Sequence, residues 1–222
     1  MRLAALKGTR IRHVGSGQDA GHVVVVDETG QAWSWGNNEH GQLGQGDTRH
    51  RSGFVNHRSH VCYTDPIFRR IPTPISGTGP GGHTIVAVSL GARHTLLLTS
   101  LGSVLATGDN TDGQCGQGEM KTKNGEEMVV VIVTRIHYML TCAVSVGKVN
   151  EEVETCTVKA LKDFTAINYS GPPVIKVSAG KEFSMLLDVE GCVWTFGCQE
   201  FGQLGNGTDG AYNSANSKVK MR

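Results

Sequence analysis

Three repeats of one glycine-punctuated segment constrain the fold of this chain more than any other feature. Residues 20–46 align without a gap to residues 92–118 and to residues 181–207, with 10 identities in 27 positions in each comparison. The shared pattern is an apolar run, a glycine, a second glycine six residues later and a closing G-Q-x-G-x-G. Its glycines are Gly30, Gly36, Gly41, Gly44, Gly102, Gly108, Gly113, Gly116, Gly191, Gly197, Gly202 and Gly205. Such self-similarity predicts a repeat architecture.

Each repeat has the local pattern of a β-hairpin followed by a tight loop. In the first repeat, residues 23–26 are apolar and β-favouring, residues 27–30 form a polar turn, and residues 32–35 alternate small and aromatic side chains. We expect Gly36, after the second strand, to adopt a backbone conformation that a β-carbon would forbid. Leu43 is predicted to pack beneath the G-Q-L-G loop. Because one hairpin buries too little to be stable, such units must stack side by side, as in propellers or solenoids.

The composition agrees with a folded all-β protein. Glycine accounts for 30 of 222 residues and proline for 6, which indicates many tight turns and excludes collagen-like sequence and helix-rich bundles. Lys plus Arg is 21 against 20 for Asp plus Glu, so a bulk nucleic-acid binder is not expected. Six scattered cysteines without CxxC pairs favour a reducing compartment. Arg135 and His137 interrupt the longest apolar run, so no membrane span is predicted.

The segment S-W-G-N-x-x-x-G-Q-L-G-x-G-D at residues 34–47 resembles the repeat of the regulator of chromosome condensation family. That family folds as a seven-bladed β-propeller. The resemblance therefore implies an all-β fold, a partial β-propeller of about three blades with two insertions. Within the family, residues 167–180, 182–185 and 196–198 are most similar to the telophase-disc paralogue.

The spacing of the repeats departs from the family pattern. Family repeats run to about fifty residues, so the longer spacings here predict insertions at about residues 48–68 and 119–158. Residues 69–75 resemble a blade-closing segment. We expect one domain over residues 6–222, with repeat cores at 14–47, 85–118 and 174–207. The insertions are either loops or an added hairpin, or translated non-coding sequence in a gene model, which comparison with the transcript would decide.

Three blades cannot close a ring, because closed propellers use about four to eight. The chain is accordingly a fragment, a unit that associates through its open edges, or an open arc with unpaired strands. Residues 213–222 stop where another strand should begin, which favours truncation. The middle repeat has Thr107 and Cys115 where the others have large apolar side chains, so we expect this blade to be the weakest.

Several candidate sites have structural interpretations that we favour. His22 and His94 share a repeat position that is Phe183 in the third repeat, which indicates strand-end histidines bonded to a neighbouring loop. His50, His57, His60 and Cys62 lack the paired spacing of zinc ligands, so no metal site is predicted. Cys115, Cys192 and Cys198 are expected to act as small hydrophobes. No phosphate-binding loop motif is present, so neither a cofactor nor catalytic residues are predicted.

Two groups of charged residues are weak candidates for partner binding. Arg49, Arg51 and Arg58 form a local basic stretch that could contact phosphate or an acidic partner, although we favour a solvated insertion. By resemblance, Glu182 matches an acidic loop position through which the family's nuclear exchange factor meets its GTPase. The matching residues in the other repeats, Gly21 and Arg93, are not acidic.

The resemblance implies a non-enzymatic interaction module. It would bind a small GTPase of the Ras superfamily and chromatin or microtubule-associated components, and regulate guanine nucleotide exchange in mitosis or at chromatin. Neither a small-molecule substrate nor a membrane partner is expected, and the implied location is the nucleus and cytoplasm, including the spindle or centromere. The alternative is a chromatin or spindle structural adaptor without exchange activity. A hydrolase or metal enzyme ranks last, and the sequence does not specify which GTPase is bound.

Overall fold

The computed structural model describes residues 6–48, 84–117, 160–167, 169–198 and 200–205 together with the backbone of several short strands. Those strands are β4 (Val55–Asn56), β5 (Val61–Cys62), β6 (Arg69–Arg70), β10 (Met120–Thr122), β11 (Glu127–Met128), β12 (Thr134–Ile136) and β13 (Val153–Cys156). None of the described residues belongs to a helix long and apolar enough to cross a bilayer.

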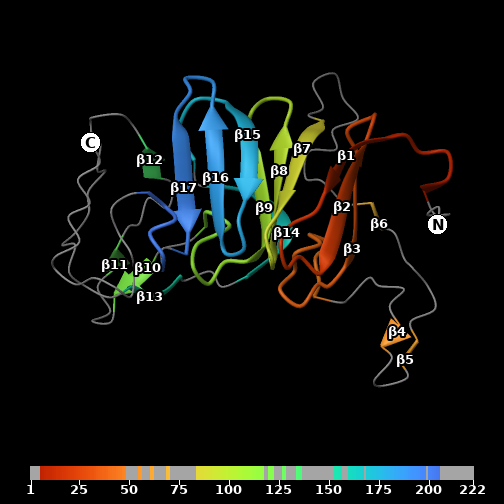
Figure 1. Ribbon diagram of the computed structural model, residues 1–222, viewed down its shortest axis with the longest axis horizontal. Coiled ribbons are helices and arrows are strands. Elements are labelled where there is room, and N and C mark those ends of the chain that lie inside the picture. Colours follow the sequence, from red (N-terminus) through yellow and green to blue (C-terminus); the bar gives the residue numbers. More distant parts are fainter. Residues whose placement is uncertain are drawn as a thin grey trace.

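Three four-stranded antiparallel sheets, here called blades, stand side by side (Figure 1). Blade one contains β1 (Ile11–Gly15), β2 (His22–Asp27), β3 (Ala32–Gly36) and β6, in that order. Blade two contains β7 (Ile85–Leu90), β8 (His94–Thr99), β9 (Val104–Asp109) and β14 (Ala160–Ala166). Blade three contains β15 (Val174–Ala179), β16 (Phe183–Asp188), β17 (Val193–Gly197) and β12. The prediction of an all-β partial propeller is confirmed.

The outermost strand of each blade has a different origin. In blade one, β6 pairs with β3 within the segment that resembles a blade-closing strand. In blade two, β14 pairs with β9 and begins after the predicted insertion. In blade three, β12 pairs with β17, although β12 lies inside the predicted insertion at 119–158. The sequence analysis did not foresee that this segment contributes a strand to blade three. The exact limits of the insertions stay a prediction.

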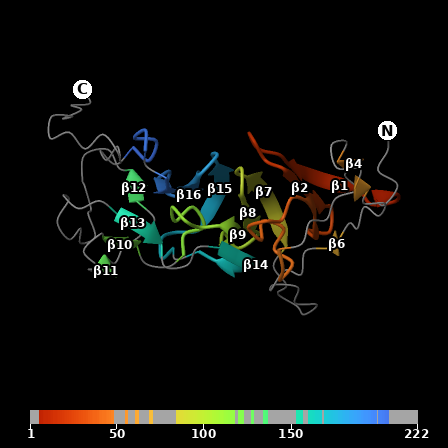
Figure 2. The same cartoon turned by 90° about the horizontal axis from the view of Figure 1, so that it is seen from below.

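The hydrophobic core lies between the blades. Blade two uses both faces of β8, because Leu97 packs with Val24 and Val26 of blade one while Leu96 packs with Leu186 of blade three. All five side chains are at most 1% exposed. The blades keep the same order in the view turned by 90° (Figure 2). Each hairpin thus obtains from its neighbours the burial that it could not achieve alone.

The glycine that follows the second strand of each hairpin has the backbone conformation that we expected. The φ angles of Gly36, Gly108 and Gly197 are 112°, 109° and 111°, a region that side chains rarely adopt. A β-carbon on Gly108 would lie 2.3 Å from the carbonyl oxygen of Arg93. That oxygen accepts a hydrogen bond from the backbone N–H of Asp109 at 2.9 Å, so the strand end must approach closely. The other repeat glycines, at 30, 41, 44, 102, 113, 116, 191, 202 and 205, also have positive φ.

The two smaller residues of the middle blade are buried and make polar contacts. Thr107 is fully buried, and its hydroxyl lies 2.9 Å from the carbonyl oxygen of Gly41 and 2.8 Å from that of Leu161. The Cys115 thiol donates to the carbonyl oxygen of Asp109 at 3.1 Å. Polar contacts are thus made at positions where the other repeats have large apolar side chains. The expectation that this blade is the weakest stays a prediction.

Candidate partner-binding face

The Asn and Gln of the repeat motif hold the loop that follows the hairpin. Asn38 accepts a hydrogen bond from the Leu43 N–H at 3.0 Å and donates to the Asp47 carbonyl oxygen at 2.9 Å. The side-chain oxygen of Gln42 accepts from the His40 N–H at 2.9 Å. Leu43 is 0% exposed beneath the loop, as predicted. These side chains provide hydrogen-bond partners for the backbone of the turn. The repeat motif is therefore structural, and we call its Asn and Gln the scaffold of the loop.

The second repeat builds the same loop with the matching residues. Asn110 accepts from the Cys115 N–H at 2.9 Å and donates to the Gln117 carbonyl oxygen at 2.8 Å. Gln114 accepts from the Asp112 N–H at 2.9 Å. Because the scaffold is shared by the first two repeats, the two positions between its Asn and the following glycine are free to differ. They are Glu39 and His40 in the first repeat, Thr111 and Asp112 in the second, and Glu200 and Phe201 in the third; of these, Glu39, Glu200 and Phe201 are exposed and the others are half-buried.

Beneath these loops, two histidines connect neighbouring blades. The Thr95 hydroxyl donates to the Gln42 carbonyl oxygen at 2.8 Å, and His22 Nε2 lies 2.9 Å from the same hydroxyl oxygen. Since a hydroxyl carries one proton, His22 Nε2 must be the donor to Thr95. His94 Nε2 bonds to the Ser184 hydroxyl at 2.9 Å in the same way. The structural interpretation of both histidines is confirmed, but their direct partner is a strand hydroxyl of the next blade rather than a loop.

Both histidines are neutral in the folded protein. Burial lowers the pKa of His22 from 6.5 to about 4. The pKa of His94 falls from 6.5 to about 3, mainly through burial, with a smaller lowering by the neighbouring His22 and an opposing effect of Asp109. The Nδ1 atom of each ring is buried without a hydrogen-bond partner. A proton would have to enter each ring at that unsolvated atom, so these side chains are suited to packing and not to proton transfer.

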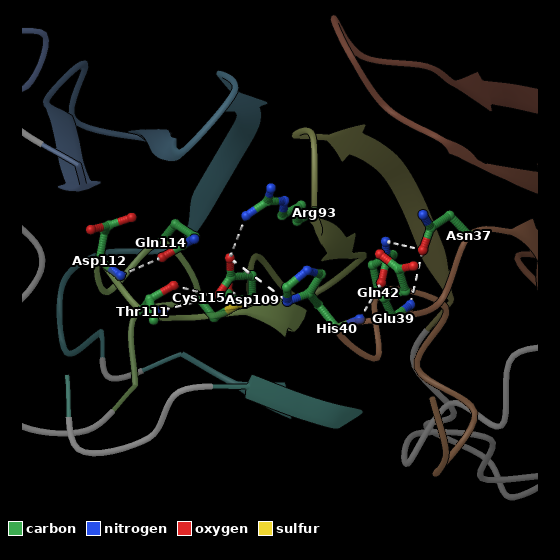
Figure 3. A network of polar contacts seen from close by, with 10 residues as sticks. All are labelled: Asn37, Glu39, His40, Gln42, Arg93, Asp109, Thr111, Asp112, Gln114 and Cys115. Carbon is green, nitrogen blue, oxygen red and sulfur yellow. Dashed lines mark hydrogen bonds and ion pairs between the residues drawn. The ribbon is translucent and has the colours of Figure 1, made fainter. Parts of the chain in front are cut away.

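The side of the blades that carries these loops is here called the loop face. A mixed-charge cleft opens on it, at the junction of blades one and two. Its volume is about 400 Å³, and its lining residues are Asp19, Gly21, Asn37, Glu39, His40, Gln42, Ala92, Arg93 and Lys181. Figure 3 shows Asp109 between Arg93 and His40. The Asp109 carboxylate lies 3.9 Å from each of these two side chains. Lys181 lies 3.8 Å from Asp19. The pair of Lys181 and Asp19 is exposed on both sides and contributes little to stability, so these two charges remain available to a partner.

A second region of the loop face, between blades two and three, is acidic. Burial raises the pKa of Asp112, and the negative charges of Asp109, Glu182 and Glu200 raise it further. We call Asp112, Glu182 and Glu200 the acidic group. Its carboxylates repel one another, and a cationic partner would relieve that repulsion. Burial also raises the pKa of the Cys198 thiol, with Asp112 and Glu182 contributing, which disfavours a nucleophilic thiolate there.

The acidic group contains one of the residues singled out from the sequence, Glu182. The candidate residues Arg49, Arg51 and Arg58 lie outside the described part of the chain. The same is true of the side chains of His50, His57, His60 and Cys62. Those interpretations therefore stay predictions. Cys115 and Cys192 are buried and Cys198 is half-buried.

Sequence reasoning missed most of the charged residues of the loop face. His40, Asp112, Lys181 and Glu200 were not proposed, and Arg93 entered only as a mismatch to Glu182. For His40, Arg93, Asp112 and Lys181 the available signal was variation, because the residue at each of these repeat positions changes between repeats. Glu200 gave no such signal, since Glu39 is the same residue at this position of the first repeat.

One group of possible metal ligands among the described residues has a structural explanation. Asp188, Glu190 and Cys192 bring their ligand atoms within 4.8 Å of one another. The Asp188 carboxylate, however, accepts hydrogen bonds from the backbone N–H of Glu190 at 2.9 Å and of Cys192 at 2.8 Å. It also accepts from Trp194 Nε1 at 2.8 Å.

Asp27 closes the matching turn of the first repeat. It accepts from Thr29 and Gln31 and, at 3.2 Å, from Trp33 Nε1. Burial raises the pKa of Asp27, but these hydrogen bonds outweigh it and the net shift is downward. An aspartate carboxylate therefore braces the hairpin in the first and third repeats.

The fold and this face together define a class, an arc of β-propeller blades whose constant loops present variable charged side chains. Models of the regulator of chromosome condensation (RCC1) repeat match residues 29–98 and 190–218, and residues 11–42, 85–114 and 174–203. The chain belongs to this family.

Curated relatives extend the match along the chain. Protein RCC2 of Homo sapiens is 31% identical over 219 residues, covering 99% of this chain and 31% of the relative. The Protein RCC2 homolog of Xenopus laevis is 32% identical over 219 residues, covering 99% of this chain and 32% of the relative. These relatives agree with the paralogue predicted from residues 167–198. The chain spans about a third of their length.

Solved structures share the fold. Human WBSCR16 has a TM-score of 0.56 at 21% identity, over 94% of this chain and 39% of that protein. Prp20p of Saccharomyces cerevisiae has a TM-score of 0.54 at 18% identity, over 90% of this chain and 36% of that protein. Prp20p is described with its binding properties to Gsp1p and histones. At these identities the likeness concerns the fold.

Proposed function

We propose that this chain is a non-enzymatic interaction module that binds a small GTPase of the Ras superfamily through its loop face. In this proposal it regulates guanine nucleotide exchange in mitosis or at chromatin. The main support is the arrangement of charge, with the acidic group beside the cations Arg93 and Lys181 on loops of the adjacent blades two and three. The description of Prp20p with Gsp1p and histones makes proteins of these classes reasonable partners to test.

Exchange of this kind needs no covalent or proton-transfer step. A module that binds the nucleotide-free GTPase more tightly than the loaded form weakens nucleotide binding by the same factor, because the coupling is reciprocal. The carboxylates of Glu182 and Asp112 suit this role. They can pair with a cationic side chain that otherwise neutralises the nucleotide phosphates.

Release of a fluorescent nucleotide from a panel of Ras-superfamily GTPases tests the proposal. We expect the chain to accelerate release from at least one of them, and Glu182→Lys to abolish the acceleration. Glu28→Lys is the matched control, because Glu28 follows the far end of β2 and its side chain forms an exposed ion pair with Arg10 at 3.6 Å. No acceleration with any GTPase would remove the exchange claim. Equal loss in both variants would contradict binding through the loop face.

A second candidate is a chromatin or spindle structural adaptor without exchange activity. The acidic group favours it as well, since clustered carboxylates attract Lys- and Arg-rich segments. Pull-down of nucleosomes at graded salt, without any GTPase, separates the candidates: retention that falls with salt and with Glu182→Lys supports the adaptor. Both candidates predict that a tagged chain locates to the nucleus and cytoplasm and, in mitosis, to the spindle or centromere.

A further inference from the structure

The mixed-charge cleft at the junction of blades one and two is a candidate site separate from the acidic group. Its walls are loops of the described blades. Among its described lining residues, Ala92 has the only apolar side chain, whereas small-molecule sites are lined mostly by apolar and aromatic side chains. A free metabolite would therefore gain little from burial here, and a side chain of a docked protein is the better occupant.

The cleft offers hydrogen-bond donors, because the oxygen atoms of its two amide side chains already serve the loop. Asn37 Oδ1 accepts from the Glu39 backbone N–H at 2.9 Å and from Gln42 Nε2 at 3.2 Å. Gln42 Oε1 accepts from the His40 backbone N–H at 2.9 Å. These contacts fix the Asn37 amide, and Figure 3 shows its nitrogen turned away from Gln42 and Glu39. Asn37 Nδ2 has no hydrogen-bond partner among the described residues, so its two N–H groups are available to a ligand.

Arg93 supplies a second set of donors. The Asp109 carboxylate lies 3.9 Å from the Arg93 guanidinium, which is beyond hydrogen-bond distance. Asp109 therefore orients the guanidinium without occupying its N–H groups. The Arg93 side chain stays 56% exposed, so its planar fork can receive both oxygens of a carboxylate.

The balance of charge favours a singly charged ligand. The two carboxylates of the lining, Asp19 and Glu39, offset its two cations, and Asp109 adds a further negative charge. The second charge of a phosphate group would gain no net attraction in these surroundings, and it would cost more to remove from water. Directed donors with little net charge therefore suit a carboxylate.

We propose that the cleft receives an Asp or Glu side chain of a partner protein docked on the loop face, with Arg93 and Asn37 as its binding residues. The proposal deepens the proposed function and rests on it, because it assigns a second contact to the same face. The acidic group takes a cationic side chain of the partner and the cleft takes an acidic one. Opposite charges at the two contacts fix the orientation of the partner, since a reversed partner would bring like charges together.

Titration of the isotope-labelled chain with capped tripeptides, followed by NMR, tests the cleft without any partner protein. We expect a capped Gly-Glu-Gly peptide to shift the side-chain amide signal of Asn37 and the backbone signals of residues 37–42 and 92–93 in a saturable way. Peptides with glutamine or phosphoserine in place of the glutamate should bind more weakly. Equal or tighter binding of either of these peptides, or no saturable shift with the glutamate peptide, would overturn the proposal.

Two substitutions test the assigned donors. Asn37→Asp keeps the oxygen that the loop needs and replaces the free NH₂ group with a second oxygen. Blade two tolerates this residue, because Asp109 at the matching position accepts from the Thr111 N–H at 3.1 Å. Arg93→Gln removes the cation. Each variant should bind the glutamate peptide about tenfold more weakly or worse, since a charge-assisted hydrogen bond is lost.

Arg10→Gln is the matched control for these variants. The Arg10 side chain is 82% exposed and lies 3.6 Å from Glu28, so the substitution also removes an exposed, paired arginine, but outside the cleft. We expect it to leave peptide binding unchanged, and thermal unfolding verifies that each variant is folded. Wild-type binding by Asn37→Asp or by Arg93→Gln would contradict the assignment of the donors.

The Arg93→Gln variant also separates this proposal from the proposed function. With a GTPase whose nucleotide release the chain accelerates, we expect the variant to bind about tenfold more weakly. Peptide binding that depends on Arg93, without accelerated release from any GTPase, would support the cleft and remove the exchange claim. Accelerated release that Arg93→Gln leaves unchanged would support exchange and overturn the cleft as a contact with the partner.

Discussion

Acid should destabilise this fold through its two buried histidines, before any carboxylate that the structure stabilises is protonated. The pKa of His22 falls from 6.5 to about 4 on folding, and that of His94 falls to about 3. The unfolded chain therefore binds protons first. The stabilisation that comes from keeping the two rings neutral is complete above pH 6.5. It is lost as the pH falls from 6.5 to about 4 for His22 and to about 3 for His94.

The magnitude follows from the same values. Between pH 7.5 and pH 5, an unfolded histidine is almost fully protonated while both folded rings stay neutral, which costs about 2 kcal/mol for each and about 4 kcal/mol together. That loss is a large part of the stability of a typical domain. The stabilisation from the ionised Asp27 is fully present above its ordinary pKa of 3.8 and is lost only below it, so it does not change between pH 7.5 and pH 5.

Urea unfolding of the chain at the two pH values measures the effect. In the double variant with His22→Phe and His94→Phe, we expect the difference between the two pH values to fall below about 1 kcal/mol. Phenylalanine is a suitable replacement because Phe183 occupies the same repeat position over a matching glycine. A double variant that loses as much stability at pH 5 as the wild type would refute the assignment of the effect to these residues.

Three further changes test the local architecture by urea unfolding. Asp188→Ala should cost about 2–3 kcal/mol, because it leaves the Trp194 N–H and two backbone N–H groups unpaired; a neutral effect would contradict the proposed brace. Gly191→Ala should cost about 1 kcal/mol for its positive φ alone, whereas Gly108→Ala should cost more because its β-carbon also meets a carbonyl oxygen. Equal costs would contradict the close approach. Ser184→Ala should cost about 1–3 kcal/mol, since it buries an unpaired N–H, and no loss would disprove this link between the blades.

Much of the fold could be predicted from the local sequence pattern of each repeat. The apolar runs and polar turns predicted the hairpins. The glycine after each second strand indicated a backbone conformation that a β-carbon would forbid, and Gly36 has a φ of 112°. Leu43 was placed correctly beneath its loop because a single apolar residue among glycines and polar residues has few other positions.

Features that depend on the meeting of distant segments were not predictable in this way. The pairing of β12 with β17 joins residues far apart in the chain, and no local period specifies it. The acidic group likewise arises only when blades two and three stack, since Asp112 and Glu182 belong to different repeats. The brace between Asp27 and Trp33 needed the hairpin register that brings strand ends together.

Amide hydrogen exchange of the chain, with and without the nucleotide-free GTPase that it binds best, tests most directly whether the loop face is the working surface. We predict protection at residues 37–46, 109–117, 180–182 and 198–205, with little change in the hairpin turns at 27–31, 99–103 and 188–192. Protection confined to those turns, or spread evenly over both ends of the blades, would contradict the account.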